Sequence, residues 1–277
     1  MTATPSGHYL EVAPGVELYY EEYGSGSPIL FVPGWTFTTE VFQHQAAHFA
    51  QNHRVILVDP RSQGRSTKTP LGNDYTTHGA DLAALANALE LRDLVLVGWS
   101  TGTLDMLGYV QHAGTTALKA AIGIDMSPKP LSVDPEAWVE GPLDDIAGAW
   151  RAFLRSPQGQ RGFIEYYATE VMVQRQLSAA ELDWIVRQSL TTPLYLASAL
   201  FADAMFCDFS AELTALAAAV PTLYVLAEHW GEPASAFLGR SFPQVQTTVF
   251  GGHMMFWEHP ERFNATLEAF IANSNLG

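Results

Sequence analysis

Short apolar runs that alternate with helical patterns constrain the fold of this chain most strongly. Six runs of four to six residues, rich in Val, Ile and Leu, occupy positions 29–32, 55–58, 94–97, 120–124, 222–226 and 245–250. Uninterrupted runs of this length suit strands that are buried on both faces, as strands of parallel sheets are. Helical patterns lie at 40–52, 79–91, 101–113, 209–219 and 260–273. The alternation predicts an α/β fold with an open, mostly parallel, doubly wound sheet.

Two segments depart from this rhythm. Residues 8–12 and 16–23 flank the turn Pro14-Gly15 and predict an N-terminal antiparallel hairpin. Between about 128 and 207 no strand run occurs, and helical patterns follow one another at 143–155, 162–174, 179–190 and, as a fourth possibility, 193–206. This stretch is too long for a connection. We therefore expect a core of residues 1–127 and 208–277 with a helical cap, 128–207, inserted in it.

Charge and cysteine content narrow the function classes. The 14 Lys and Arg against 29 Asp and Glu give a net charge of −15, which disfavours nucleic acid and anionic membrane surfaces as partners. A single cysteine, Cys207, allows neither an intrachain disulfide nor a multi-cysteine metal site. Met1 to Leu10 lacks the basic and apolar regions of a signal peptide. We expect a cytoplasmic protein, and its oligomeric state stays open.

One serine lies in a special context. The predicted strand 94–97 runs into Gly98-Trp99-Ser100-Thr101-Gly102, and a helical pattern follows at once. A nucleophile elbow needs a strand before the serine, a helix after it, and flanking glycines that let the backbone pack closely around a strained turn. A plain glycine turn between strand and helix is the alternative reading. The context favours Ser100 as a nucleophile.

Three further motifs carry a resemblance to a known family. They are Pro33-Gly34-Trp35 after the first core strand, the stretch from Asp59 to Ser66 (DPRSQGRS) after the next, and Gly251-Gly252-His253 after the last. In this order and spacing they resemble the oxyanion loop, the D-x-R-G-x-G-x-S loop and the terminal histidine loop of the α/β-hydrolase superfamily. The resemblance runs from residue 29 to residue 271 except for the predicted cap. It implies an α/β-hydrolase fold.

Nine histidines compete for the role of the base that takes the serine proton. His253 follows the last predicted strand on a glycine-rich loop at the carboxyl end of the sheet, where ligands of such sheets bind. His259, six positions on, precedes Pro260 at the start of a helix, and we interpret it as structural. His253 is the predicted base.

The acid that orients the base departs from the common family pattern. The resemblance places it after strand 222–226, where a tryptophan, Trp230, occupies its usual position. Asp125, at the end of strand 120–124, is the alternative that some family members use. It could instead cap the loop that leads into the insertion, and Glu228 and Glu232 remain lesser candidates. We predict a Ser100-His253-Asp125 triad.

The remaining site residues are predicted from position. The backbone N–H groups of Trp35 and Thr101 would form the oxyanion hole. The insertion is rich in large apolar side chains, of which we expect half or more to be core and the rest to line a pocket. The tentative pocket residues are Trp99, Trp150, Phe153, Tyr167, Trp184 and Met254. No cluster of Arg or Lys could grip a phosphate, and we expect no metal and no cofactor.

These residues predict a serine hydrolase, a carboxylic ester hydrolase, that cleaves a small or aromatic, uncharged ester or lactone. The first alternative is a cofactor-free dioxygenase, because some members resembling this chain use a His–Asp pair, here His253 and Asp125, to oxidise 3-hydroxy-4-quinolones. Haloperoxidase-like perhydrolysis would use the same triad. Haloalkane dehalogenation needs an aspartate in place of Ser100. A non-catalytic ligand-binding protein is the last alternative.

Overall fold

The computed structural model describes residues 6–274. The signal-peptide prediction rests on Met1–Leu10, and residues 1–5 of that segment lie outside the described residues. An eight-stranded sheet, in the order β1-β2-β4-β3-β5-β6-β7-β8, forms its centre. The strands are β1 (Ser6–Ala13), β2 (Val16–Gly24), β3 (Ser27–Val32), β4 (His53–Val58), β5 (Leu94–Trp99), β6 (Leu118–Ile124), β7 (Thr222–Leu226) and β8 (Gln246–Val249). β1 and β2 form the antiparallel hairpin, β2 pairs antiparallel with β4, and the pairs from β4 to β8 are parallel. The predicted doubly wound sheet with an N-terminal hairpin is confirmed.

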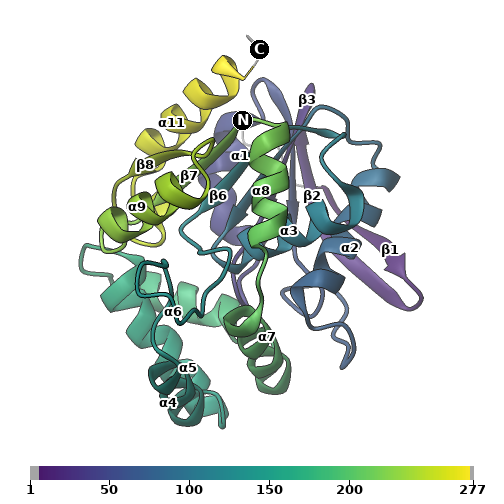
Figure 1. The fold of residues 1–277 in the computed structure, drawn as a ribbon. Helices are drawn as coiled ribbons and strands as arrows, with labels where there is room; N and C mark the ends of the chain where they lie inside the picture. The colour runs from purple at the N-terminus through teal and green to yellow at the C-terminus, as the bar shows by residue number, and fades with distance from the viewer. Residues whose placement is uncertain (1–5, 275–277) are drawn as a thin grey trace.

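Helices cover both faces of the sheet (Figure 1). Helices α2 (Tyr75–Ala88), α3 (Thr101–Ala113) and α8 (Ser210–Ala219) pack side by side on one face, and α1 (Gln43–Phe49) contacts α11 (Pro260–Asn273) on the other. A short helix, η1 (Thr39–Phe42), precedes α1. The strands β3 to β7 are almost fully buried between these layers. Their continuous apolar sequences are explained by this double coverage.

Residues 128–207 contain no strand, and they are mainly helical from Leu143 onward. They form α4 (Leu143–Phe153), α5 (Pro157–Tyr167), the single π-turn η2 (Ala168–Met172), α6 (Ala179–Ser189) and α7 (Leu194–Phe206), which lie together below the sheet in Figure 1. Local sequence fixes two of the starts. The Ser156 hydroxyl accepts the Gly159 amide beside Pro157, and Ser178 forms a reciprocal capping box with Glu181.

Three elements differ from the sequence prediction. β8 was expected to be buried on both faces, but it is the edge strand and most of its residues are exposed. The helices α9 (Gly231–Ser241) and α10 (Met255–Glu258) were not predicted. Within residues 6–274, no single helix is long and apolar enough to cross a membrane, and α7 with α8 passes that test only as a pair bent by 71°.

Candidate active site

Ser100 lies on a sharp turn between β5 and α3. Its backbone angles, φ 53° and ψ −129°, are unusual for a residue with a side chain and cost on the order of 1–3 kcal/mol. Two hydrogen bonds hold the turn: the Ser100 amide donates to the Ile124 carbonyl of the neighbouring strand at 2.7 Å, and Thr103 donates to the Ser100 carbonyl at 2.8 Å. The serine is thereby raised at the carboxyl end of the sheet.

Glycines on either side make this turn possible. A Cβ atom on Gly98 would lie 2.2 Å from the Gly102 carbonyl oxygen, and one on Gly102 would lie 2.3 Å from that of Val32. Backbone occupies both positions and has little room to move. The two glycines of the G-x-S-x-G pattern are therefore required for close packing of strand β3, strand β5 and helix α3.

His253 and Asp125 meet at the same edge of the sheet. His253 follows β8, Asp125 follows β6, and His253 Nδ1 lies 2.6 Å from Asp125 Oδ2 with both side chains buried. Because a carboxylate only accepts, Nδ1 carries the proton and Nε2 is free to act as a base. The second oxygen of Asp125 accepts the Ala227 amide at 2.8 Å. The carboxylate thus orients the imidazole and fastens the end of β7.

The loop that carries His253 is held from two sides. Its amide donates to the Val171 carbonyl at 3.1 Å, and the next amide, that of Met254, donates to the Met172 carbonyl at 2.8 Å. From the core side, the Trp99 indole donates to the His253 carbonyl at 2.8 Å. Both the π-turn of the helical segment and the residue before Ser100 therefore position the imidazole.

The other acid candidates lie away from the imidazole. Glu228 is exposed, and its carboxylate accepts a hydrogen bond from Gln174 Nε2 at 2.8 Å. This bond is the main cause of the lowered pKa of Glu228. Glu232 lies on the exposed first turn of α9. Among the three carboxylates considered from sequence, Asp125 is the one that the structure brings to His253.

The predicted oxyanion donors flank Ser100. Val32 pairs with Gly98 in the sheet, so the loop after β3, which carries Trp35, lies beside the serine turn. Thr101 is the first residue of α3, and an amide there has no acceptor within its helix. The Trp35 indole donates to the Ala197 carbonyl of α7 at 2.8 Å, which fixes this loop under the helical segment.

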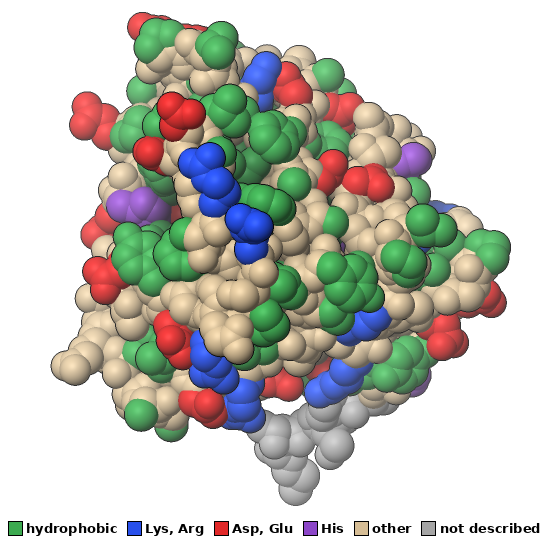
Figure 2. All heavy atoms as spheres, turned by 90° about the horizontal axis from the view of Figure 1, so that it is seen from below, with side chains coloured by type: hydrophobic (Ala, Val, Ile, Leu, Met, Phe, Trp, Pro, Cys, Tyr) green, Lys and Arg blue, Asp and Glu red, His purple; other side chains and the backbone are tan. Residues whose placement is uncertain are grey.

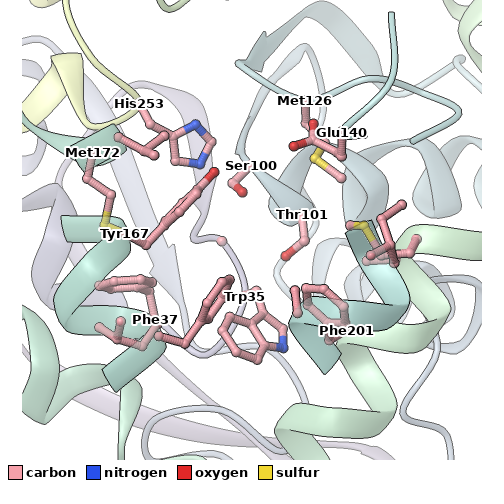
Figure 3. Close-up of a pocket in the computed structure, with 18 of the residues that line it drawn as sticks. Trp35, Phe37, Ser100, Thr101, Met126, Glu140, Tyr167, Met172, Phe201 and His253 are labelled. Carbon is pink, nitrogen blue, oxygen red and sulfur yellow. The ribbon is translucent and has the colours of Figure 1, made fainter. Parts of the chain in front are cut away.

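A cavity of about 400 Å³ opens over these groups. Figure 3 shows the Ser100 side chain and the His253 imidazole facing it together, with Trp35, Tyr167 and Phe201 around them. Core loops and the helices α4, α5 and α7 all contribute to its wall. Its size is that of a small-molecule site.

Only some of the tentative pocket residues line this cavity. Trp99 and Tyr167 line the cavity, whereas Trp150, Phe153, Trp184 and Met254 are not among the residues that line it. Trp150 bonds to Ser198 and borders a second, outer cavity, and Phe153 packs on Phe163. Trp184 stacks on Trp257, and Met254 is fully buried. These side chains face neighbouring helices instead of the cavity.

Sequence reasoning missed Glu140. This residue, in the irregular segment before α4, lines the cavity, and burial raises the pKa of its carboxyl to about 7 against the opposing attraction of His253. Tyr167 packs edge-on against the His253 ring at 5.5 Å. Burial, followed by the nearby carboxyls of Glu140 and Asp125, raises the pKa of the Tyr167 phenol well above its usual value, so that it stays a neutral donor. No sequence pattern marks either role.

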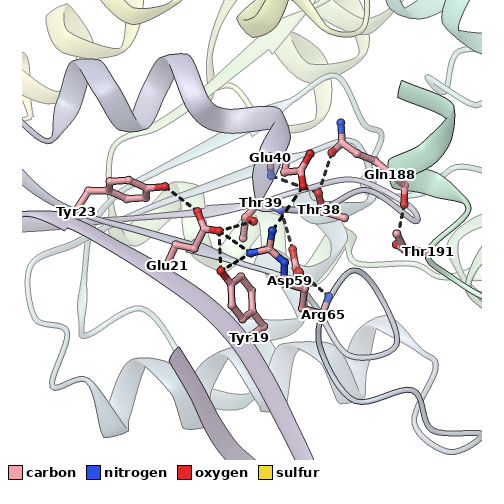
Figure 4. Close-up of polar contacts among 10 residues, drawn as sticks. All are labelled: Tyr19, Glu21, Tyr23, Thr38, Thr39, Glu40, Asp59, Arg65, Gln188 and Thr191. Carbon is pink, nitrogen blue, oxygen red and sulfur yellow. Dashed lines mark hydrogen bonds and ion pairs between the residues drawn. The ribbon is translucent and has the colours of Figure 1, made fainter. Parts of the chain in front are cut away.

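The loop after β4 supports the site from behind. Asp59 accepts the amides of Thr39 and Arg65, each at 2.7 Å, and so joins this loop to the one that follows Trp35 (Figure 4). In the same view Thr38 donates to Gln188 of α6 at 2.8 Å. Asp59 thus organises its loop and is not among the residues that line the cavity.

A serine on a strained strand-to-helix turn of a doubly wound sheet is typical of α/β hydrolases. A model described as the alpha/beta hydrolase family matches residues 29–266, and the chain belongs to that family. Within residues 6–274, no group of three or more potential His, Cys, Asp or Glu ligands is placed to hold a metal.

Relatives of known activity class include haloperoxidases and esterases. The non-heme haloperoxidase of Rhodococcus erythropolis is 37% identical over 153 residues, 55% of this chain and 56% of that protein; the match thus spans about half the length of such curated relatives. The crystal structure of bromoperoxidase from Bacillus anthracis superposes with a TM-score of 0.86 at 21% identity, over 96% of this chain and 100% of that one. An esterase from Exiguobacterium antarcticum superposes with a TM-score of 0.86 at 22% identity, over 96% of this chain and 100% of that one. The structural likenesses show the fold.

Proposed function

We propose that this protein is a carboxylic ester hydrolase that cleaves small or aromatic, uncharged esters or lactones through an acyl-enzyme on Ser100. The observation that carries the proposal is the buried 2.6 Å bond between Asp125 and His253 at the cavity that Ser100 also lines. It supports a triad in which each member has one role. Ser100 attacks, His253 moves the proton, and Asp125 holds the imidazole and stabilises its cation.

The reaction proceeds in two steps. Nε2 of His253 takes the Ser100 proton while Oγ adds to the ester carbonyl, and the amides of Trp35 and Thr101 stabilise the oxyanion. The tetrahedral intermediate collapses, His253 gives its proton to the leaving alcohol, and an acyl-enzyme remains. Water, deprotonated by the same imidazole, then attacks the acyl carbon and releases the acid. The Tyr167 hydroxyl, beside the imidazole, is available to donate to the substrate.

A second activity is compatible with the same acyl-enzyme. If hydrogen peroxide replaces water in the second step, the product is a peracid in place of the acid. The similarity to the Rhodococcus haloperoxidase and to a bifunctional esterase/perhydrolase of Acinetobacter calcoaceticus, 30% identical over 136 residues, favours this variant. Its first step, and the residues that perform it, are those of ester hydrolysis.

Hydrolysis of p-nitrophenyl acetate tests the proposal. We expect Ser100→Ala to abolish turnover and Asp125→Asn to lower kcat by roughly 10³–10⁴-fold, because the imidazole loses its tautomer and its counter-charge. Glu228→Gln, a change of charge on the same side of the molecule but off the cavity, serves as the control and should keep the wild-type rate. If Ser100→Ala keeps its activity, or takes up oxygen with a 3-hydroxy-4-quinolone, the acyl-enzyme proposal is wrong and the dioxygenase alternative gains.

A further inference from the structure

The charges of the cavity wall are of one sign. Glu140 and Asp145 are its acidic side chains, and among the described residues that line it there is no Lys or Arg. Basic side chains lie outside, on the outer face of the helical segment, where Figure 2 shows them scattered among apolar and acidic groups. Asp145 is exposed, whereas Glu140 is partly buried and lies deeper.

Glu140 points at the reacting groups. Figure 3 shows its carboxyl directed into the cavity, across from the His253 imidazole and beside Ser100. Its backbone is fixed, because its amide donates to the Pro130 carbonyl at 2.9 Å. The carboxyl itself receives no hydrogen bond from any residue in the range 6–274, and the charges that act on it are those of His253 and Asp125. A cation bound in the cavity would give this carboxyl a partner of opposite charge.

Aromatic rings line the rest of the same cavity. Trp35, Tyr167 and Phe201 line the cavity with Glu140, and ring faces attract ammonium groups. A positive group held there would satisfy the carboxylate, and the cavity of about 400 Å³ has room for a short ester that carries one. A carboxylate-bearing ester would meet repulsion from the same side chain.

We propose that Glu140 is the specificity residue of this cavity, whose carboxylate binds a positively charged group of an ester held at Ser100. The inference rests on the proposed ester hydrolysis at Ser100 but changes the preferred substrate from an uncharged ester to a cationic one: esters of amino or quaternary-ammonium alcohols, for which the uncharged isostere is the weaker substrate. Asp125 is present in wild type and in Glu140→Gln alike, so a comparison of the two proteins isolates the contribution of the Glu140 carboxylate.

Burial sets the pH above which the Glu140 carboxyl is charged. It raises the pKa of Glu140 to about 7, and a bound cation would favour the ionised form and pull that pKa down. The titratable groups that face Glu140 are His253 from the loop before α10, Asp125 from β6, Tyr167 from α5 and Asp145 from α4. A permanent cation is the suitable probe, because its own charge does not change with pH.

Two thioesters of equal shape test the proposal. Acetylthiocholine carries a trimethylammonium group, and S-(3,3-dimethylbutyl) thioacetate carries an uncharged tert-butyl group in its place. We expect wild type to prefer acetylthiocholine, and Glu140→Gln to lower the ratio of the two kcat/KM values by about 10-fold. Glu136→Gln removes one charge from the same segment at an exposed position off the cavity and should leave the ratio unchanged. A ratio that is the same in Glu140→Gln as in wild type overturns the proposal.

A binding measurement separates this inference from the proposed function. Saturation-transfer NMR compares choline with 3,3-dimethyl-1-butanol on wild type and on Glu140→Gln, and needs no turnover. Selective loss of choline binding in Glu140→Gln supports the assignment even if neither thioester is cleaved, in which case ester hydrolysis alone is contradicted. Equal choline binding to the two proteins overturns the assignment whether or not esters are cleaved.

Discussion

Asp125 accepts two hydrogen bonds at once, from His253 and from the Ala227 amide. Because each oxygen accepts one of these bonds, the carboxylate is held in one orientation. The carboxylate in turn fixes the orientation of the imidazole. The two readings that the sequence leaves open for Asp125, triad acid and structural anchor of a loop, are thus not alternatives. The same buried side chain does both. Its backbone has φ 53°, and its amide donates a hydrogen bond to the Val225 carbonyl at 3.0 Å.

Glu140 should make the free energy of unfolding depend on pH. Its pKa in the folded protein, about 7, lies above the ordinary 4.5, so folding favours the protonated form. The stabilisation is complete below about pH 4.5 and is lost as the pH rises through 7. Between about pH 5 and about pH 8, the unfolding free energy of wild type should fall by on the order of 2 kcal/mol relative to that of Glu140→Gln. This loss is smaller than the full pKa shift would give, because the side chain is partly exposed. Urea unfolding at both pH values measures this, and a constant difference between the two proteins would contradict it.

At the scale of elements, the loop after β4 is joined to α2 by a buried ion pair. Arg61 donates twice to Asp81, each time at 2.7 Å, and both side chains are less than a tenth exposed. The first cause of the raised pKa of Arg61 is this bond. Since the same loop holds Asp59 against the segment after Trp35, the pair fixes α2 relative to the oxyanion loop.

Asp81→Asn should therefore destabilise the protein by about 3–5 kcal/mol, because it leaves the Arg61 charge buried without a counter-charge. Asp183→Asn is the control. It breaks the bond to Arg187 on α6, where both side chains are more than half exposed, and should cost less than about 0.5 kcal/mol. Denaturant midpoints of the two variants give the comparison, and equal losses would show that burial does not govern the pair.

The elements also show what sequence alone determines. Helices α3 and α11 and strand β7 begin and end where their patterns predict. Gly114 follows the end of α3, Pro221 precedes β7, and Pro260 is the first residue of α11. β8 has a strand sequence, but its place at the edge depends on the sheet order, which no local pattern encodes. α9 was missed because Gly231 and Pro233 in its first turn are typical of loops.

Part of the candidate site could likewise be predicted from sequence, and part could not. Ser100, Asp125 and His253 could be placed from sequence because carboxyl ends of parallel strands converge at one edge of a sheet. The cavity wall could not, since it depends on how the inserted helices are rotated over that edge. Trp184 was expected there and stacks on Trp257 instead, and Glu140 lies in a segment without periodicity.

At the scale of the whole molecule, the helical segment and the sheet share one apolar core. Ile146, Ile164 and Leu200 of the inserted helices belong to the same buried cluster as the residues of β3 to β7. Polar contacts add to it, among them the bond between Thr38 and Gln188. The division into a core and a cap thus describes the order of the chain, and we expect the two parts to unfold together.

Urea unfolding followed by far-UV circular dichroism and by tryptophan fluorescence should give one coincident transition. Three of the seven tryptophans, Trp138, Trp150 and Trp184, lie in the segment 128–207, so fluorescence would report its separate loss. Two separate transitions, or midpoints that differ between the two probes, would mean that the inserted helices unfold independently of the sheet.

The central claim is that Ser100, activated by His253 and Asp125, is acylated by the substrate. Rapid acid quenching of the enzyme with p-nitrophenyl acetate, followed by peptide mass spectrometry, tests it most directly. The account predicts one acetyl group on the peptide that contains Ser100, and none on it in Ser100→Ala or His253→Ala. Ester turnover without an acetyl group on that peptide, or an acetyl group that forms there equally in His253→Ala, would contradict it.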